Sequence, residues 1–415
     1  MYFIYNILVY VASFFLGIIA KFNTKLGLFV AGRKLVFKTL ANQISATDKV
    51  IWFHTASLGE FEQGLPVLEA LKEKYPDHKF VLTFFSPSGY EVKKDSGVAD
   101  VITYLPLDTK ANARNFVKLV HPELVIFVKY EFWPNYLAAL KKQHIHTISI
   151  STIFRSSQVF FKFYGSWMRK SLRAFDHIFV QDETSQQLLK RINFTDVTIS
   201  GDTRFDRVLE ILDRDNSLSF IENFKNNTTT IVIGSSWQED EAIFVPFINA
   251  SAEDCKFIIA PHNIKSQEIE KLKNSIKKST VLFSEMEQHT DLSQFEVFIV
   301  DTIGILTKVY SYADIAYVGG GMGTTGLHNT LEPAVFGIPV VVGKNFTGFK
   351  EAEDLVQLGG VLSVNSKATF EQLMHRLLTD AVFKISVGDI NRNYVQANGN
   401  ACTKIMAYLS ERVNS

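Results

Sequence analysis

The sequence predicts an α/β protein with two Rossmann-like domains. Two observations support this prediction: short apolar runs alternate with amphipathic helical patterns in two separate series, and most of the runs end in glycine or polar residues. Such alternation is typical of parallel sheets whose strands are joined by crossover helices. The chain of 415 residues also exceeds the length that one hydrophobic core usually supports.

The first series predicts one Rossmann-like domain. Its helical patterns include residues 62–74 and 110–120. Its expected strands are residues 50–54, 80–85, 101–104, 124–128, 146–149 and 177–181. The polar, charged stretch 213–228 interrupts the pattern and is predicted to be a linker.

The second series predicts a similar domain. Its expected strands are residues 230–234, 256–260, 281–283, 297–301, 314–319 and 339–343. Two such domains facing a central cleft form the GT-B architecture, and ligands of such sheets lie at the carboxyl ends of the strands. The predicted division is a membrane anchor at 1–22, a first domain at 23–212, a linker at 213–228, a second domain at 229–388, and a C-terminal helix at 389–415 that packs back on the first domain.

The N-terminus is unusually apolar. Residues 2–20 are interrupted only by Asn6, Ser13 and Gly17, and about 20 such residues can span a bilayer core. The bases that follow, which place the remainder in the cytoplasm by the positive-inside rule, are Lys21, Lys25, Arg33, Lys34 and Lys38. We predict a membrane anchor, spanning or partly inserted; a buried first helix is the alternative. The stretch 154–173 mixes aromatic and basic residues, which suits a membrane interface or an ordinary helix equally.

Composition excludes several function classes. Acidic and basic residues balance at 43 each, so no global field favours nucleic acid. Two cysteines, Cys255 and Cys402, offer neither a disulfide framework nor metal-ligand spacing. No phosphate loop of the GxxxxGK[ST] type and no GxSxG elbow is present. We therefore expect no metal and no cofactor.

The segment 317–333 is the most informative motif. An apolar run stops at Gly320 and Gly321, where the absence of Cβ atoms lets the backbone approach a ligand. The N–H groups of the helix expected next favour a phosphate, and Glu332 can accept hydrogen bonds from sugar hydroxyls. Phosphate and hydroxyl groups together describe a nucleotide. A simple tight turn explains the glycines but not the grouping of His328, Asn329 and Glu332.

Three further strand ends in the second domain carry ligand-type residues. They are Ser235 and Ser236; Pro261, His262 and Asn263; and Gly304, Ile305 and Leu306. The two serines could hold a phosphate or sugar hydroxyl, or could belong to an ordinary helix N-terminus with an acidic first turn. Backbone groups of the third set could bind a base. Each signal is weak alone, but their repetition predicts a nucleotide site.

In the first domain, three charged residues follow strands. Glu60 is expected near a helix start, where it could be a general base or could merely complement the helix dipole. Glu131 could face the same cleft or cap a helix. Arg204 could bind a phosphate or carboxylate, or pair with Asp202 or Asp206.

These motifs together resemble the 3-deoxy-D-manno-octulosonic acid (Kdo) transferases of lipopolysaccharide assembly. The resemblance covers nearly the whole chain and rests on HTASLGEF, FSPSGYE, YEFWPN, GDTRFDRV, the block from YADIAYVGGG to GLHNTLEPA, and GIPVVVGKNFTGFKEAEDL. It implies a GT-B enzyme at the cytoplasmic face of the inner membrane. Such enzymes move Kdo from CMP-Kdo to a lipid A precursor (lipid IVA). It also implies that the first domain binds the acceptor and the second the nucleotide sugar.

The resemblance also implies residue roles. Glu60 matches the general base, and Glu131 and Arg204 match positions that stabilise the transition state. The matched CMP contacts are Pro261, His262, Asn263, Gly304, Ile305, Leu306, Asn329, Thr330, Leu331 and Glu332. Two alternatives remain open from the residues: another GT-B sugar-nucleotide enzyme, such as a UDP-sugar transferase or an epimerase, and a membrane-tethered nucleotide-binding scaffold without turnover.

Overall fold

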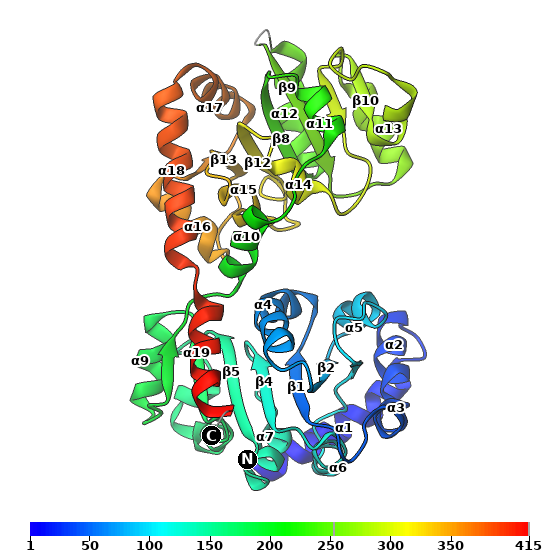
Figure 1. Cartoon of the computed structure of the whole chain (residues 1–415), viewed down its shortest axis with the longest axis vertical. Coiled ribbons are helices and arrows are strands. Elements are labelled where there is room, and N and C mark those ends of the chain that lie inside the picture. The colour runs from blue at the N-terminus through cyan, green and yellow to red at the C-terminus, as the bar shows by residue number, and fades with distance from the viewer. Residues whose placement is uncertain (252–253, 414–415) are drawn as a thin grey trace. The chain divides into compact units, whose positions relative to one another are not determined.

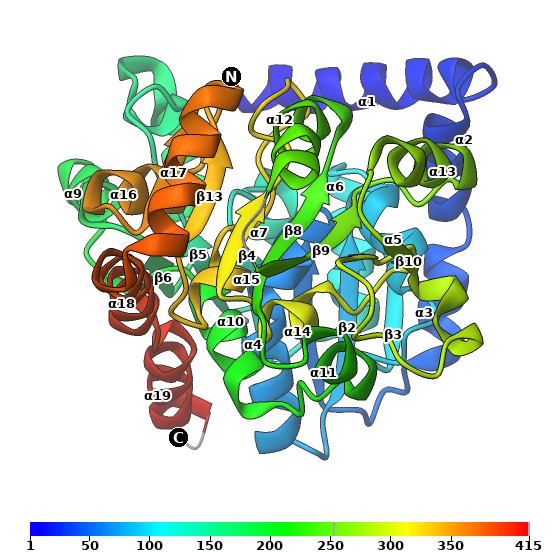
Figure 2. The same ribbon diagram turned by 90° about the horizontal axis from the view of Figure 1, so that it is seen from above.

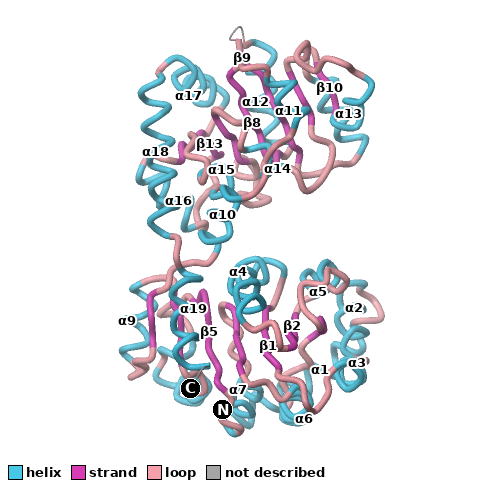
Figure 3. The backbone as a smooth tube through the Cα atoms, viewed as in Figure 1, coloured by secondary structure: helices cyan, strands magenta, loops and turns pink. Residues whose placement is uncertain are grey.

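The computed structural model describes residues 1–251 and 254–413, which form two compact units (Figure 1). The first unit comprises Met1–Arg207 together with the chain from Gly399 onward, and the second comprises Val208–Asn398. Each unit contains one seven-stranded sheet in which every pairing is parallel. Strands are magenta and helices cyan in Figure 3. The predicted α/β class with two Rossmann-like sheets is confirmed.

The sheet of the first unit has the order β3-β2-β1-β4-β5-β6-β7. Its strands are β1 (Val50–Thr55), β2 (Lys79–Phe84), β3 (Val101–Tyr104), β4 (Leu124–Val128), β5 (His146–Thr152), β6 (His177–Val180) and β7 (Val197–Ile199). The order reverses between β1 and β4, so the connections after these two strands leave in opposite directions along the sheet. This reversal is the point at which doubly wound sheets bind ligands.

Helices cover both faces of this sheet. They are α1 (Tyr2–Ile19), α2 (Thr24–Arg33), α3 (Val36–Gln43), α4 (Leu58–Lys74), α5 (Pro87–Lys93), α6 (Lys110–Val120), α7 (Pro134–Lys142), α8 (Ser166–Leu172), α9 (Glu183–Arg191) and α19 (Ala401–Val413), with short 3₁₀ turns at Val159–Phe161 and Phe163–Gly165. Alternate residues of β1 face opposite cores: Trp52 packs with α6 and α7, and Phe53 with α4 and α19. Burial on both faces explains why these strands are continuous apolar runs.

The sheet of the second unit has the order β10-β11-β9-β8-β12-β13-β14 and reverses between β8 and β12. Its strands are β8 (Thr229–Ser236), β9 (Cys255–Pro261), β10 (Thr280–Leu282), β11 (Val297–Ile299), β12 (Ile315–Val318), β13 (Val340–Gly343) and β14 (Val361–Val364). Its helices are α11 (Ser219–Lys225), α12 (Gln238–Ala250), α13 (Ser266–Ser275), α14 (Leu306–Tyr310), α15 (Leu331–Ala334), α16 (Lys350–Leu358), α17 (Lys367–Thr379) and α18 (Ala381–Asn398), with a 3₁₀ turn at Phe283–Gln288. Helix α10 (Arg204–Asp213) runs through the boundary of the two units.

All twelve predicted strands are present, with ends shifted by up to three residues. The sequence missed one edge strand in each unit, β7 and β14. Both are short, and β7 has no fully buried residue, so neither shows the continuous apolar run of a central strand.

The predicted linker 213–228 differs from the structure. Helix α11 lies within it, and Ile221 and Phe224 of this helix are fully buried. Phe220 of the same helix also packs on Phe283 and Phe298. These few apolar side chains lie in an otherwise polar stretch, so composition alone predicts a connection. The C-terminal part also divides differently: α18 continues to Asn398 in the second unit, and the chain rejoins the first unit at Gly399.

The N-terminal helix α1 is, among the described residues, the one helix long and apolar enough to cross a membrane by length and composition. Its mean hydropathy is 2.0, and only 6% of it is buried. The alternative prediction of a buried first helix is therefore wrong.

Helix α19 packs against the first unit through Ile405 and Leu409, which are both fully buried beside α4. We expect Ile405→Ala to lower the free energy of unfolding of this unit by about 2–5 kcal/mol, because the truncation leaves a cavity. Urea denaturation measures this change. Glu411→Ala, at an exposed position of the same helix, is the control and should change stability by less than about 0.5 kcal/mol. Equal effects of the two substitutions would contradict this packing.

Candidate functional site

The predicted carboxylates of the first unit lie at the reversal of its sheet. Glu60 follows β1 and Glu131 follows β4, and these two strands are hydrogen-bonded neighbours. Helix α4 after β1 covers one face of the sheet and helix α7 after β4 covers the other. Both residues therefore belong to the edge where a crevice forms between diverging connections.

Glu60 is the third residue of α4, whose N-cap is Ser57. It is half-buried, and the Ser57 hydroxyl donates a hydrogen bond to its Oε2 atom. The positive end of a helix stabilises negative charge at this position. The position satisfies both interpretations made from the sequence, because a carboxylate that complements the helix dipole also carries a proton-accepting oxygen.

Glu131 is held by a buried hydrogen-bond network. Its Oε2 atom lies 2.8 Å from Trp133 Nε1 and 3.2 Å from His54 Nε2. On the other side of the imidazole ring, His54 Nδ1 lies 2.8 Å from the hydroxyl of Thr83, which accepts a hydrogen bond from Trp52 Nε1 at 2.7 Å. His54 is fully buried, whereas 14% of the Glu131 side chain remains exposed.

Both ring nitrogens of His54 have further neighbours. Nδ1 also lies 3.2 Å from the carbonyl oxygen of Thr83, and Nε2 also lies 3.2 Å from Trp133 Nε1. The orientation of the ring is therefore fixed from both sides, whichever nitrogen carries the proton. His54 is thus a positioning residue for Glu131. The sequence placed it only at a strand end, since its partner lies 77 residues away.

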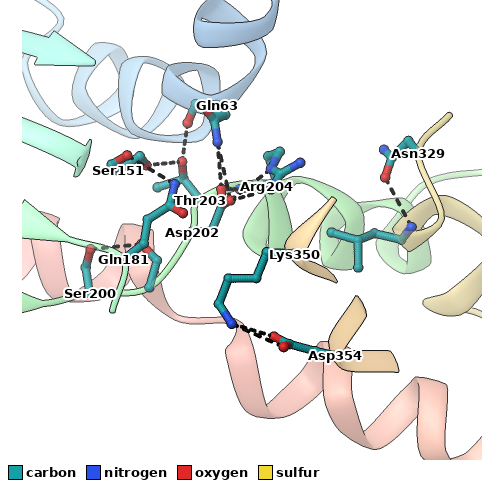
Figure 4. A network of polar contacts seen from close by, with 12 residues as sticks. Gln63, Ser151, Gln181, Ser200, Asp202, Thr203, Arg204, Asn329, Lys350 and Asp354 are labelled. Carbon is teal, nitrogen blue, oxygen red and sulfur yellow. Dashed lines mark hydrogen bonds and ion pairs between the residues drawn. The ribbon is translucent and has the colours of Figure 1, made fainter. Parts of the chain in front are cut away.

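Arg204 is paired with Asp202, as one of the sequence alternatives allowed. Its Nε and Nη2 atoms lie 2.9 and 2.8 Å from Asp202 Oδ2 (Figure 4). Asp202 is buried and also accepts from the amide of Gln63 at 3.1 Å. Asp206 serves elsewhere, since it accepts from the backbone of Asn400 and Cys402 at the start of α19. Arg204 remains 37% exposed, so part of its guanidinium can meet a ligand.

Electrostatics connect Glu60 with Arg204. Burial raises the pKa of the Tyr130 hydroxyl, the charge of Arg155 opposes this rise, and the charges of Glu60 and Asp202 add to it. Arg204 also lowers this pKa. The charges of both Glu60 and Arg204 therefore affect the pKa of Tyr130. Gln63, one turn after Glu60 on α4, donates a hydrogen bond to Asp202, the partner of Arg204. The three predicted catalytic residues thus share one edge of the first unit.

In the second unit, the predicted ligand residues follow four adjacent strands. The strands are β11, β9, β8 and β12, in that order across the sheet. The corresponding residues at the ends of these strands or after them are Gly304, Ile305 and Leu306; Pro261, His262 and Asn263; Ser235 and Ser236; and Gly320, Gly321, Asn329, Thr330, Leu331 and Glu332. The parallel sheet therefore gathers all four sets at its carboxyl edge.

Asp240 connects two of these strand ends. It is fully buried, and its Oδ2 atom accepts from the backbone N–H groups of Trp237 at 2.9 Å and Gly320 at 2.8 Å. Its Oδ1 atom accepts from the Tyr317 hydroxyl at 2.7 Å. The carboxylate fixes the turn after β8 against the glycine turn after β12. Sequence reasoning counted Asp240 only as part of an acidic first helical turn.

Three rings stack beside these turns. Trp237 and His262 stack at 4.4 Å between centroids with an interplanar angle of 21°, and His262 and His328 lie 4.6 Å apart at 36°. Trp237 Nε1 donates to His328 Nε2 at 3.2 Å. Burial lowers the pKa of His328, and the nearby His262 lowers it further. His328 is therefore the neutral tautomer with its proton on Nδ1.

The glycine segment adopts the expected close turn but not the expected helix. Gly320 has φ +89°, and a Cβ atom there would meet the carbonyl oxygen of Gly326. The helix that follows, α15, has only four residues, and its N-cap is Thr330. Asn329 Oδ1 accepts from Leu331 N at 3.1 Å, and Asn329 Nδ2 donates to Glu332 Oε1 at 3.1 Å. Side chains and turn amides, rather than a long helix, line this strand end.

Two buried hydroxyls at this edge have no hydrogen-bond partner among the described residues. They belong to Ser236 and Thr330, which are 2% and 1% exposed. Ser236 lines a cavity of about 330 Å³ together with Trp237, Pro261 and Asn263. An orphaned buried hydroxyl favours a polar ligand that can complete its hydrogen bonds. Within residues 1–251 and 254–413, no group of three His, Cys, Asp or Glu side chains could hold a metal ion.

Comparison with known proteins identifies the family. Residues 30–207 match the family described as "3-Deoxy-D-manno-octulosonic-acid transferase (kdotransferase)". The 3-deoxy-D-manno-octulosonic acid transferase of Aquifex aeolicus is 30% identical over 78% of this chain and 88% of its own length. The chain belongs to the Kdo transferase family. The transferase of Haemophilus influenzae, 26% identical over 86% of each chain, is a further relative.

Solved structures support the fold of this Kdo transferase. The UDP-GlcNAc 2-epimerase of Neisseria meningitidis superposes with a TM-score of 0.61, 16% identity, and coverage of 88% of this chain and 100% of that one. A putative UDP-N-acetylglucosamine 2-epimerase of Listeria monocytogenes gives a TM-score of 0.58 at 13% identity, covering 89% and 97%. At these identities the likeness shows the fold alone. The chain is a GT-B glycosyltransferase of lipopolysaccharide biosynthesis.

We expect Asp240→Asn to destabilise the second unit of the Kdo transferase by about 2–3 kcal/mol, because asparagine has one acceptor oxygen in place of two and its amide nitrogen then faces a donor that the carboxylate had accepted from. Glu239→Gln, the same type of change at the neighbouring exposed residue, is the matched control. Urea unfolding distinguishes the two variants. A loss in both variants would assign the effect to helix charge rather than to the buried network.

His328 should make stability depend on pH. Its folded pKa lies below its ordinary value of 6.5. The unfolded chain therefore binds this proton more tightly, and the free energy of unfolding should fall as the pH drops from about 6.5 through the folded pKa. In His328→Asn this part of the slope should disappear. Urea unfolding between pH 7.5 and 5.5 measures it, and parallel slopes for both proteins would refute the assignment.

Proposed function

We propose that this chain transfers Kdo from CMP-Kdo to a hydroxyl of the lipid A precursor lipid IVA, with inversion at the anomeric carbon. The first unit binds the acceptor and supplies the base, and the second unit binds the donor. The proposal is carried by one observation: in a member of the Kdo transferase family, Glu60 and Glu131 follow adjacent strands at the sheet reversal of the first unit. No cofactor or metal takes part.

Glu60 is the general base in this proposal. The acceptor hydroxyl gives its proton to a Glu60 oxygen while its own oxygen attacks the anomeric carbon of Kdo. The bond between that carbon and the CMP phosphate breaks, and its electron pair leaves with CMP. Ser57, whose hydroxyl donates to Glu60, orients the carboxylate before the reaction. A positioned base of this kind contributes about 10²–10⁴ in rate.

Charge on the reacting groups is balanced by Glu131 and Arg204. An oxocarbenium-like Kdo carbon is stabilised by the negative charge of Glu131, which His54 and Trp133 hold in place. The leaving phosphate gains negative charge, which the exposed part of Arg204 neutralises. Because Asp202 already fixes the guanidinium, little reorganisation is needed when this charge develops.

The donor is held at the carboxyl edge of the second unit. Ser235 and Ser236 bind the phosphate beside the turn at Gly320 and Gly321, which Asp240 holds through the Gly320 N–H group. Glu332 accepts from the ribose hydroxyls, and backbone groups of Gly304, Ile305 and Leu306 meet the cytosine. The support for this assignment is the pair of unpartnered hydroxyls on Ser236 and Thr330 beside the Trp237–His262–His328 stack.

The enzyme works at the cytoplasmic face of the inner membrane in this proposal. The acceptor is a lipid, and α1 offers an apolar side with ten exposed large hydrophobic residues. They are Phe3, Ile4, Ile7, Leu8, Tyr10, Val11, Phe14, Phe15, Ile18 and Ile19. The bases from Lys21 to Lys38 follow directly, which favours the cytoplasmic side for the two units.

Glu60→Gln tests the base. With purified enzyme, CMP-Kdo and lipid IVA, we expect Kdo transfer measured by mass spectrometry to fall by about 10²–10⁴-fold. The dissociation constant for CMP should stay unchanged, because the donor binds to the other unit. Glu62→Gln, on the next residue but one of α4, is the control and should retain activity. Near-native turnover by Glu60→Gln would exclude the assignment.

Calorimetry with CMP and UDP tests the donor. The proposed enzyme binds CMP at least about ten-fold more tightly than UDP, whereas a UDP-sugar transferase or epimerase would show the reverse. A scaffold without turnover would bind nucleotide but yield no Kdo-containing product with this acceptor.

A further inference from the structure

Helix α1 packs against the first unit along its whole length. The residues with half-buried or buried side chains are Tyr2, Tyr5, Asn6, Val9, Ser13, Leu16 and Ala20. Their spacing of three, one, three, four, three and four residues defines one continuous stripe on a helix. A helix that left the protein to cross a bilayer would contact its domain at one end only. Figure 2 shows α1 as one straight helix that leads into α2.

Buried polar bonds fix the first turn of α1. The Tyr5 hydroxyl donates to Asp108 Oδ2 at 2.6 Å, and the Tyr2 hydroxyl donates to Asn135 Oδ1, also at 2.6 Å. Asn135 in turn donates to Asn6 Oδ1 at 3.1 Å. Asp108 and Asn135 are 2% and 3% exposed. Pulling this turn away would leave a buried carboxylate and a buried amide without these partners, which is costly.

The other end of α1 is fixed through α2. Four residues after Ala20 the chain enters α2 at Thr24. Arg33 at the end of α2 donates to Leu105 O at 2.9 Å and to Phe85 O at 2.6 Å. Near this end, Ser13 and Leu16 line a cavity shared with Phe29 and Arg33 of α2. Both ends of the 18-residue helix are therefore attached to the same unit, about 27 Å apart.

A basic cavity adjoins the start of α1. It has a volume of about 440 Å³, and Tyr2 and Trp167 line it together with Lys141, Lys142 and Lys170. All three lysines are exposed. The neighbouring turn exposes Phe163 at 93% and Tyr164 at 49%, while Phe154 and Phe160 of the same aromatic–basic stretch lie in the core. Part of the stretch 154–173 thus packs in the core, and another part exposes aromatic side chains beside lysines.

We infer that α1 lies in the plane of the membrane interface, with its apolar side in the acyl chains, and that Lys141, Lys142 and Lys170 bind the phosphate of an anionic phospholipid. The apolar side and the lysines match the two parts of a phospholipid surface. The inference rests on the proposed membrane attachment and is independent of the transfer reaction.

Spin-label depth tests the orientation of α1. Cysteines at Ile4, Val11 and Ile18, which are seven residues apart on the exposed side, are labelled one at a time with a nitroxide in the Cys255→Ser, Cys402→Ser background. The full chain is bound to phosphatidylcholine–phosphatidylglycerol vesicles without acceptor. We expect all three labels at one depth, within a few ångströms. A label at Val11 near the bilayer centre, with shallow labels at Ile4 and Ile18, would overturn the inference and leave membrane attachment intact. Three labels exposed to water would refute both.

Lysine substitution tests the headgroup site. Lys141→Gln, Lys142→Gln and Lys170→Gln together should weaken binding to vesicles containing phosphatidylglycerol on the order of 100-fold, at about five-fold per lysine. Binding to pure phosphatidylcholine should not change. The control is Lys72→Gln, Lys74→Gln and Lys404→Gln, on α4 and α19, which cover the opposite face of the sheet. If both triple variants lost vesicle affinity equally, net charge alone would explain the effect and the proposed headgroup site would be wrong.

Discussion

The reversal of strand order in each parallel sheet is the constraint on which the rest of the structure depends. All strands of a sheet point the same way, so every connection that could carry chemistry starts from one edge. At β1 and β4, and again at β8 and β12, the connections diverge and leave backbone groups and side chains without neighbours from the next helix. Each proposed reactive or binding residue lies on such an edge, and the remainder of each unit holds these edges rigid.

Buried polar networks and an ion pair keep the functional groups in place. Glu131 depends on His54, Arg204 on Asp202, and the glycine turn on Asp240. In each case a residue that meets solvent or ligand is oriented by one that is nearly or fully buried. This division favours preorganisation, because the buried partner loses its hydration once, during folding, and not again in each catalytic cycle.

Strands in the centre of the sheets and the residues at their ends could be predicted from the sequence, because burial on both faces produces continuous apolar runs that stop at polar residues. The supporting residues could not. His54 and Asp240 act through partners 77 and 80 positions away, which come close only when the sheet forms. The choice of Asp202 over Asp206 as partner of Arg204 likewise depends on where α19 begins, because Asp206 is engaged by its first backbone amides.

Attachment of α1 along a whole side has a consequence for preparing a soluble enzyme. Truncation before Asn23 would strip Asp108 of the Tyr5 hydroxyl and Asn135 of both its helix partners, so the loss of lipid affinity would come with a damaged domain surface. Polar replacements at Phe3, Phe14 and other exposed positions of α1 would leave these hydrogen bonds intact. For crystallisation without detergent, polar substitutions on the outer side of α1 are therefore a better choice than deletion of the helix.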